Sequence, residues 1–292
     1  MIVHLTARTR GGAPVLADPA VAGWLWRALR RGFPEALAAV LMPSHPHVVA
    51  TAESPAAARV RLARILGAAA RRCSRPGAEP IRWDPVPEPK VVTDREKLRR
   101  DVRYVIMNPC RARLVRDPLE WLWSTHRDVM GAVADPWVPA AKLARAFEQP
   151  VGGFRNAVHR YVSGDPSCDV RGSPPPRPAP AVEHSRYPLQ RIAAAALAAT
   201  RAAPEALRSR TRTRAAFVLL ASQQGWHDPG ELARFCGLKL RAVYHRRGHD
   251  EPELLTAAAL CLGDDRLLKP WCPAAGVSGA HPAAVAPGRA VP

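Results

Sequence analysis

None of the six cysteines in this 292-residue chain lies in a C-x-x-C pair. A zinc knuckle or a thioredoxin-like redox motif is therefore not expected, because both need two cysteines at that spacing. The cysteines are scattered along a chain of ordinary size, which does not fit a disulfide-stabilised scaffold either. Reduced thiols in a cytoplasmic protein are the expectation.

Long apolar segments are also missing. Residues 1–12 lack the apolar core of a signal peptide, and the Ala-rich stretch 192–200 is far too short to cross a bilayer. We therefore expect a soluble, cytoplasmic protein with no membrane partner.

Acidic residues are scarce, since 25 Asp and Glu stand against 43 Lys and Arg, a formal net charge of +18. This surplus predicts a polyanionic partner, and nucleic acid is the leading candidate because phosphates attract Lys and Arg. Most of the basic residues are arginines, whose planar guanidinium binds phosphate through two hydrogen bonds and stacks on bases. A GC-rich codon bias is the alternative source of the arginines, but it leaves the charge unchanged.

The clearest boundary in the chain is the stretch "SPPPRPAP" within residues 164–182. Proline at this density forms neither helix nor sheet, so we expect a stiff, extended linker there. Residues 1–163 mix strand and helix patterns and form one predicted domain. Residues 183–272 have only helical patterns, and the Ala/Pro/Gly-rich residues 273–292 are expected to be a disordered tail.

Local patterns place the elements of the first domain. A strand is expected at 2–6, and residues 37–50 predict either two strands or one strand bent at Pro43. Asp18 and Asp94 each precede a helical pattern in the position of an N-cap. The predicted helices are 21–31, 54–73, 97–107, 140–147 and 156–162, and the third should end at Asn108-Pro109.

His45 and His47 are separated by one residue in "MPSHPHVV". Positions i and i+2 of a strand share a face, so both imidazoles would project together and offer two nitrogen ligands to one divalent ion. Taken alone, such a pair is more often an ordinary surface feature.

Tyr104 and Asn108 are four residues apart, a spacing that puts two side chains on one helix face. A phenol and an amide oxygen could therefore approach the histidine pair together. The alternatives are a half-buried aromatic for Tyr104 and a simple helix stop for Asn108.

In combination, these segments resemble the HUH single-tyrosine transposases, and most closely the REP-associated type. The resemblance extends over roughly residues 1–163, in matching order and spacing. It is carried by "VHLTARTRGG" (3–12), "AVLMPSHPHVV" (39–49), Trp83, "LRRDVRYVIMNPCRARLV" (98–115), "DPLEWLWSTHRDVMG" (117–131), "KLARAF" (142–147) and "YVSG" (161–164).

This resemblance implies an α+β fold, a ferredoxin-like antiparallel sheet with helices, in a protein that acts as a homodimer. It implies an enzyme in which His45, His47 and Asn108 bind Mg²⁺ or Mn²⁺ and Tyr104 attacks a phosphate of single-stranded hairpin DNA. The products would be a 5′-phosphotyrosyl enzyme and a free 3′-hydroxyl, at repeated palindromic elements. The basic turn that holds Arg8 and Arg10 is a further candidate DNA contact.

The chain departs from the family pattern at four positions. Ser44 and Pro46 stand where the family usually has Asn and a bulky apolar residue, and Cys110 and Arg113 replace the usual Val and Gly. A proline lacks a backbone donor and fits poorly inside a sheet, so Pro46 is expected to tilt one histidine against the other. The alternative hypothesis is therefore a catalytically decayed transposase that binds DNA as a regulator.

The C-terminal region has the pattern of a helix-turn-helix. An apolar-striped helix at 213–223 precedes "DPGELARFCGLKLRAVYHRRG" (228–248), with Asp228 as N-cap, Gly237 at the turn and a second helix at 239–247. Such a second helix enters the major groove of duplex DNA. Its candidate DNA contacts are Arg241, Tyr244, His245, Arg246 and Arg247. The region resembles the DNA-binding domain of the initiator DnaA, and a plain helical bundle with a basic face is the alternative.

Overall fold

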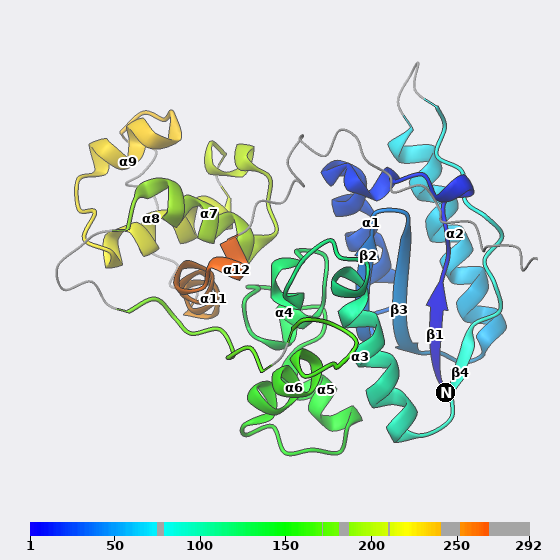
Figure 1. The fold of residues 1–292 in the computed structure, drawn as a ribbon. Helices are drawn as coiled ribbons and strands as arrows, with labels where there is room; N and C mark the ends of the chain where they lie inside the picture. The colour runs from blue at the N-terminus through cyan, green and yellow to red at the C-terminus, as the bar shows by residue number, and fades with distance from the viewer. Residues whose placement is uncertain (75–78, 171, 181–186, 210, 241–251, 269–292) are drawn as a thin grey trace, which may run out of the picture.

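The computed structural model of the chain describes residues 1–74, 79–170, 172–180, 187–209, 211–240 and 252–268. A four-stranded antiparallel sheet forms the centre of the N-terminal part, with helices on both of its faces (Figure 1). The described residues of the C-terminal part contain helices and connecting segments. The chain is therefore an α+β protein, which confirms the predicted fold class.

The sheet has the strand order β2-β3-β1-β4, and all neighbouring strands are antiparallel. Its strands are β1 (Ile2–Thr6), β2 (Ala36–Met42), β3 (His45–Thr51) and β4 (Lys90–Val92). Helix α1 (Pro19–Gly32) connects β1 to β2, and α2 (Pro55–Cys73) lies between β3 and β4. This βαββαβ sequence with β1 and β3 at the centre is the ferredoxin-like arrangement. Of these four strands, β4 is the one absent from the predicted elements, because three residues carry too little periodicity.

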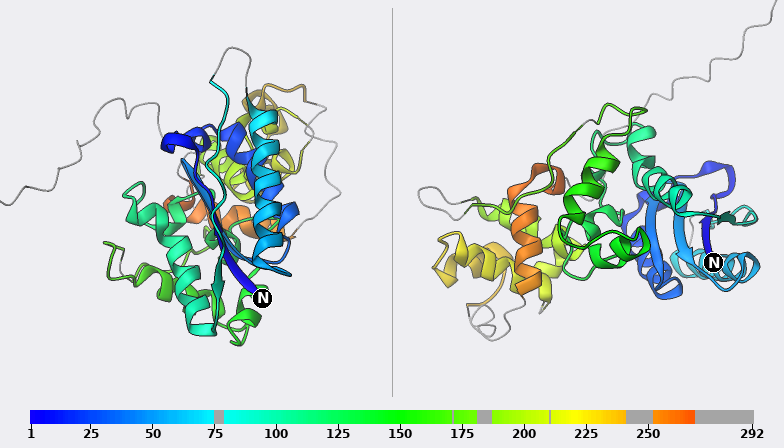
Figure 2. Two further views of the ribbon diagram at one scale, coloured as in Figure 1. Left: turned by 90° about the vertical axis from the view of Figure 1, so that its right-hand side faces the viewer. Right: turned by 90° about the horizontal axis from the view of Figure 1, so that it is seen from below.

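The helices begin where the sequence predicts. The carboxylate of Asp18 accepts a hydrogen bond from the first turn of α1, and that of Asp94 does the same for α3 (Arg95–Arg111). Helices α1 and α2 cover one face of the sheet, while α3 runs across the other (Figure 2, left). Helix α3 contacts β2, β3 and β4 there, and a further helix of the N-terminal part, at 140–146, also contacts β2.

The segment 121–125 covers the edge of the sheet formed by β2. The Leu41 N–H of β2 donates to the carbonyl of Trp123 at 3.0 Å. The Thr125 N–H donates to the carbonyl of Ala39, also at 3.0 Å. Because this edge is covered, few backbone groups of β2 are left unpaired. Its all-apolar sequence "ALAAVLM" is buried along its whole length.

Helix α3 continues past its predicted end, so the expectation of a stop at Asn108-Pro109 is wrong. Pro109 lies inside the helix, which ends at Arg111. Proline removes the N–H that would bond to the carbonyl of Val105. The amide of Asn108 approaches that carbonyl instead, with Nδ2 3.5 Å from Val105 O and 2.9 Å from Tyr104 O. The side-chain amide of Asn108 thus replaces the missing backbone donor and allows α3 to continue to Arg111.

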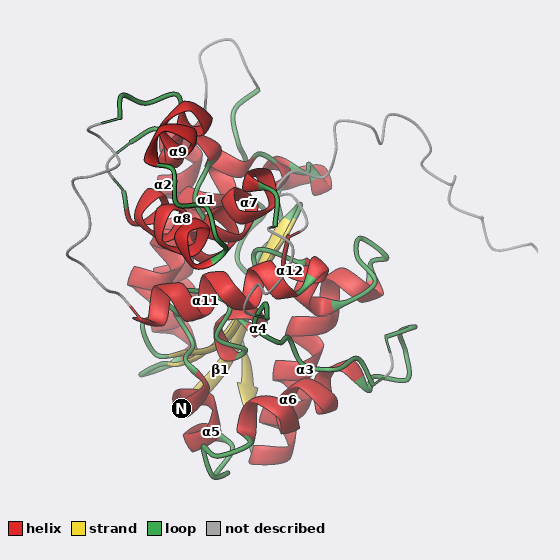
Figure 3. Cartoon of the chain, turned by 90° about the vertical axis from the view of Figure 1, so that its left-hand side faces the viewer, coloured by secondary structure: helices red, strands yellow, loops and turns green. Residues whose placement is uncertain are grey.

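The remaining helices of the N-terminal part pack beside α3. They are α4 (His126–Val129), α5 (Ala140–Ala146) and α6 (Phe154–Ser163). The C-terminal helices stand in the foreground of Figure 3 and are α7 (Leu189–Thr200), α8 (Arg212–Gln223), α9 (Pro229–Cys236), α11 (Pro252–Gly263) and α12 (Asp265–Leu268). No helix in the described part of the chain is long and apolar enough to cross a membrane.

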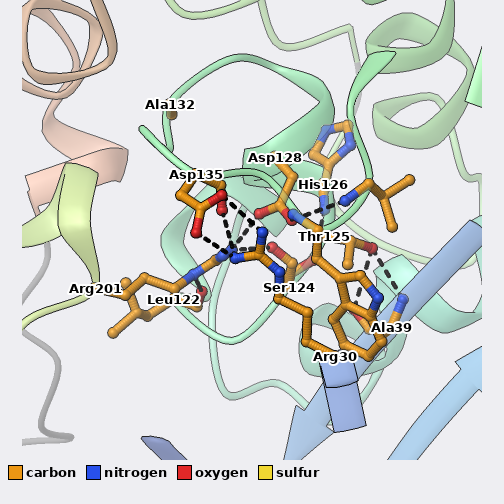
Figure 4. A network of polar contacts seen from close by, with 12 residues as sticks. Arg30, Ala39, Leu122, Ser124, Thr125, His126, Asp128, Ala132, Asp135 and Arg201 are labelled. Atoms are coloured by element: carbon orange, nitrogen blue, oxygen red, sulfur yellow. Dashed lines mark hydrogen bonds and ion pairs between the residues drawn. The ribbon is translucent and has the colours of Figure 1, made fainter. Parts of the chain in front are cut away.

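A buried ion pair joins the C-terminal helices to the sheet-containing part (Figure 4). Arg201, which follows α7, donates to the carboxylate of Asp128 in α4 at 2.6 Å. The same guanidinium donates to the carbonyls of Leu122 and Ser124 at 3.1 and 2.8 Å. The side chains of Arg201 and Asp128 are only 7% and 0% exposed. A charge buried this deeply is tolerated because Nε and Nη2 of Arg201 and both carboxylate oxygens of Asp128 have hydrogen-bond partners.

The proline-rich segment packs against α11. The Ala179 N–H donates to the carbonyl of Ala259 at 2.9 Å. A Cβ at Gly263 would lie only 2.4 Å from the carbonyl oxygen of Arg177, so the two backbones touch. The boundaries expected around this segment stay predictions, and the predicted tail 273–292 lies outside the described residues.

Candidate active site

Three histidines from two neighbouring strands lie on one face of the sheet. In the pairing of β1 with β3, His4 lies opposite Val49, and Thr6 lies opposite His47. Opposed residues share a face, as do residues two apart in one strand, so His4 joins His45 and His47. The Nε2 of His4 lies 3.1 Å from the Nδ1 of His47.

The two histidines of the H-x-H motif are neighbours, as their spacing predicts. The ring centroids of His45 and His47 are 5.0 Å apart, with the ring planes at 76°. Pro46 between them is the second residue of β3 and pairs with Leu41 of β2. It lies beyond the last pair that β3 makes with β1, so its missing N–H does not interrupt the central ladder.

Each of these two imidazoles uses its Nδ1 for a hydrogen bond within the protein. The Nδ1 of His45 lies 3.0 Å from the hydroxyl of Ser44, and the Nδ1 of His47 is bonded to His4. The Nε2 of His47 is buried and has no partner among the described residues. Within the same residues, the hydrogen bonding of His45 involves Nδ1 alone. Both rings therefore keep Nε2 available.

Burial keeps these histidines neutral. Desolvation is the main cause that lowers the pKa of His47 to about 3. Burial also lowers the pKa of His4 and of His45 from its usual value, and the charge of Arg8 lowers that of His45 further. Neutral imidazole is the form that donates a lone pair to a metal ion.

Tyr104 meets the histidines from α3. Its ring centroid lies 5.9 Å from that of His47 and 6.0 Å from that of His4, edge-on in both cases. The tyrosine is 43% exposed, so its phenol is accessible from solvent. Asn108, one turn further along α3, binds the Tyr104 carbonyl through Nδ2, which leaves its Oδ1 as the atom able to bind a ligand.

An arginine that sequence reasoning missed packs on the tyrosine. The guanidinium carbon of Arg111 lies 5.0 Å from the centre of the Tyr104 ring, and its Nη1 donates to the Tyr104 carbonyl at 3.2 Å. The buried carboxylate of Asp165 holds Arg111 from the other side. Because 54 residues separate Arg111 from Asp165, no local pattern links them.

His4 is the second missed residue. The strand "IVHLT" gives only a weak signal for His4, which lies between the buried apolar residues Val3 and Leu5 and so faces the other side of the sheet. The register that brings it to His47 depends on the pairing of β1 with β3, which the sequence does not display.

The described part of the chain contains no group of three or more His, Cys, Asp or Glu side chains arranged to hold a metal ion. The candidate ligands are instead two imidazole Nε2 atoms and one amide oxygen, from His45, His47 and Asn108. The unpartnered, buried Nε2 of His47 fits such a role, because a buried polar atom without a partner is costly unless something binds it. The residues present are therefore compatible with a divalent ion.

The predicted DNA contacts near the first strand border the same site. Arg8 and Arg10 are exposed in the turn after β1. That turn is tied to the segment around Trp83, because the Asp84 N–H donates to the Arg8 carbonyl and the Arg10 N–H to that of Arg82, at 2.8 and 2.9 Å. The Thr9 N–H between the two arginines donates to the carbonyl of Ser44 at 2.9 Å, so the turn lies against the residue before His45.

The first helix and the turn of the expected helix-turn-helix are described. Asp228 caps α9 through the Gly230 N–H at 2.8 Å, and Gly237 after it has a φ of 65°, as a tight turn requires. The five candidate contacts of the second helix lie outside the described residues, and they are Arg241, Tyr244, His245, Arg246 and Arg247.

No protein-family profile matches the chain, and no curated protein matches it either. Among solved structures, the chain is similar to a REP-associated tyrosine transposase bound to a REP hairpin. The two chains are 23% identical, and the match covers 44% of this chain and 78% of that one, with a TM-score of 0.36. At that score the similarity does not establish an activity for this chain.

Proposed function

We propose that this chain cleaves and rejoins single-stranded DNA, with the Tyr104 hydroxyl as nucleophile and with His45, His47 and Asn108 as ligands of a divalent ion. One observation carries the proposal. The accessible phenol of Tyr104 lies beside the ring of His47, whose buried Nε2 has no partner among the described residues.

The reaction is a transesterification at phosphorus. The phenol oxygen attacks a DNA phosphate, the bond from phosphorus to the 3′-oxygen breaks, and the proton lost by the phenol ends on that 3′-oxygen. The products are a 5′-phosphotyrosyl enzyme and a free 3′-hydroxyl, which can reverse the step without a high-energy cofactor. A phenol is a weak nucleophile at neutral pH. The bound ion would supply charge stabilisation at the phosphate.

The nature of the ligands favours Mn²⁺ over Mg²⁺. Mg²⁺ prefers oxygen ligands in octahedral geometry, whereas this site offers two imidazoles and one amide oxygen. Either ion would be held by His45, His47 and Asn108.

The charge of the chain supports a nucleic-acid substrate. A net charge of +18 attracts phosphate, and Arg8 and Arg10 are exposed in a turn whose Thr9 N–H donates to the carbonyl of Ser44, the residue before His45. We propose hairpin DNA from repeated palindromic elements as the substrate and a homodimer as the working state.

The test is covalent capture of DNA. The protein is incubated with Mn²⁺ and single-stranded hairpin DNA and then run on a denaturing gel. We expect a shifted band that disappears in Tyr104→Phe. The matched control is Tyr161→Phe, because Tyr161 also lies against an arginine, with the guanidinium carbon of Arg103 4.8 Å from its ring centre. If both variants keep the band, Tyr104 is not the nucleophile.

The second candidate is a DNA-binding regulator without catalysis. The capped helix α9 and the turn at Gly237 favour it, since they match the first half of a helix-turn-helix. DNA binding that is non-covalent, independent of Mn²⁺ and unchanged in Tyr104→Phe would support the regulator over the enzyme.

A further inference from the structure

We propose that His4 and Ser44 are positioning residues that fix the protons of the His45 and His47 rings on Nδ1 and so keep the Nε2 lone pairs available for an ion. The role of these residues in ion binding rests on the proposed metal site. Their hydrogen bonds to the two Nδ1 atoms are present in the metal-free protein.

Two independent hydrogen bonds support the proposal. Ser44 Oγ lies 3.0 Å from the Nδ1 of the adjacent His45. His4 Nε2 lies 3.1 Å from the Nδ1 of His47, although 43 residues separate the two in sequence. The same ring atom is thus held in both histidines, once by a local contact and once by the pairing of β1 with β3.

Burial decides the direction of the bond between His4 and His47. A proton on the Nε2 of His47 would be a buried N–H without an acceptor among the described residues. A proton on Nδ1 is donated to His4 Nε2 instead, and His4 then carries its own proton on Nδ1. Orphaned buried donors are rarer than under-satisfied acceptors, so the second arrangement is favoured.

For His45, the hydroxyl of Ser44 is able to donate or accept. As an acceptor, Ser44 Oγ receives a hydrogen bond from Nδ1–H, and the Nε2 of the partly exposed His45 keeps its lone pair. Ligating histidines in proteins almost always have their other ring nitrogen held in this way, and loss of the outer partner typically weakens metal affinity by about 10- to 100-fold.

The first experiment reads the tautomers directly. Long-range ¹H–¹⁵N spectra of the metal-free full chain, labelled at histidine and measured at neutral pH, distinguish a proton on Nδ1 from one on Nε2. We expect His45 and His47 to be protonated on Nδ1. A proton on Nε2 of either ring, or an even mixture of tautomers, would overturn the proposal for that ring.

The second experiment measures Mn²⁺ affinity by calorimetry in paired variants. Ser44→Ala and His4→Phe remove the acceptors and should weaken binding by about 10-fold or more. Ser44→Thr and His4→Gln keep an oxygen acceptor and should restore most of the affinity. The matched control is Ser163→Ala, which removes a hydroxyl from another buried histidine, His159, and should leave Mn²⁺ affinity unchanged.

The two experiments separate the positioning role from the proposed function. If the wild-type chain binds no Mn²⁺ while both rings are protonated on Nδ1, the metal site is wrong and the positioning contacts are right. If Mn²⁺ binds with equal affinity in Ser44→Ala and His4→Phe, neither residue positions a ligand. Thermal unfolding of each variant shows whether a change in affinity reflects a loss of fold.

Discussion

Two histidine pairs in this chain have almost the same hydrogen bond and different surroundings. The ring nitrogens of His4 and His47 are 3.1 Å apart, and those of His126 and His159 are 3.0 Å apart. Each pair also contains a buried nitrogen with no partner among the described residues, Nε2 in His47 and Nδ1 in His126. Neither feature alone therefore marks a functional site.

Access separates the two pairs. The rings of His126 and His159 are stacked 5.2 Å apart at 11°, and both residues are 0% exposed. The pair at His47 borders Tyr104, which is 43% exposed. The buried pair joins α4 to α6, whereas the other pair places a neutral imidazole beside a solvent-exposed phenol. An accessible phenol next to an unpartnered nitrogen is what distinguishes the candidate site.

The largest expected effect on ion binding comes from removing one histidine of each pair. His47→Asn should weaken Mn²⁺ affinity by at least about 100-fold, because it removes a proposed ligand rather than an outer partner. His126→Asn should leave that affinity unchanged and lower the free energy of unfolding by about 1–3 kcal/mol, since it disturbs a buried hydrogen bond. Calorimetry with Mn²⁺ and urea unfolding of both variants test the contrast. Equal Mn²⁺ affinities in the two variants would mean that the His47 pair differs from the His126 pair in no way that matters for ion binding.

A second large effect is expected beside the buried pair. Asp128→Ala leaves the guanidinium of Arg201 buried without its carboxylate, so the free energy of unfolding should fall by about 3–5 kcal/mol. Chemical denaturation measures this loss. A change below about 1 kcal/mol would show that the junction does not stabilise the chain. The variant is also expected to bind Mn²⁺ with the wild-type affinity while it remains folded.

The pH dependence of stability should reflect both pairs. Burial lowers the pKa of His47 to about 3, against 6.5 in the unfolded chain, and lowers that of His126 as well. The unfolded state therefore binds protons first, so stability is lost as pH falls below 6.5 toward 3 and is independent of these groups above that window.

Replacing His47 with Gln should flatten this dependence by at most about 1.4 kcal/mol per pH unit. Urea unfolding between neutral and acidic pH, with His126→Gln alongside, checks the prediction. An unchanged slope in both variants would mean that neither ring is buried in its neutral form.

The smallest expected effect lies at the end of the helix that carries Tyr104. Arg113 has a φ of 56°, in the left-handed region that favours glycine. Arg113→Gly should raise the free energy of unfolding by about 1 kcal/mol without altering Mn²⁺ affinity. Urea unfolding tests the gain, and a loss of stability would indicate that the Arg113 side chain makes a contact worth more than the backbone strain.

The elements that depend on local patterns were predictable from the sequence. The spacing of His45 and His47 in a strand fixes their shared face, and Asp18 and Asp94 cap helices where expected. Tyr104 reaches the histidines because α3 runs across the sheet, which follows from its apolar face.

The features that depend on particular side-chain or strand contacts were not predictable. The stop expected at Pro109 fails because a side-chain amide replaces the missing donor. His4 reaches His47 through strand register, and Asp165 reaches Arg111 across a long separation in sequence. These partners are set by three-dimensional packing rather than by periodicity, so single-sequence reasoning has no signal for them.

Mapping a covalent adduct tests the central claim most directly. The full chain is incubated with Mn²⁺ and a pool of single-stranded hairpin oligonucleotides, digested with protease and nuclease, and analysed by mass spectrometry. The account predicts a nucleotide 5′-phosphate on the peptide that contains Tyr104, and its loss when EDTA is present. A nucleotide on any other residue, or no adduct in a chain that demonstrably binds both the ion and the DNA, would contradict it.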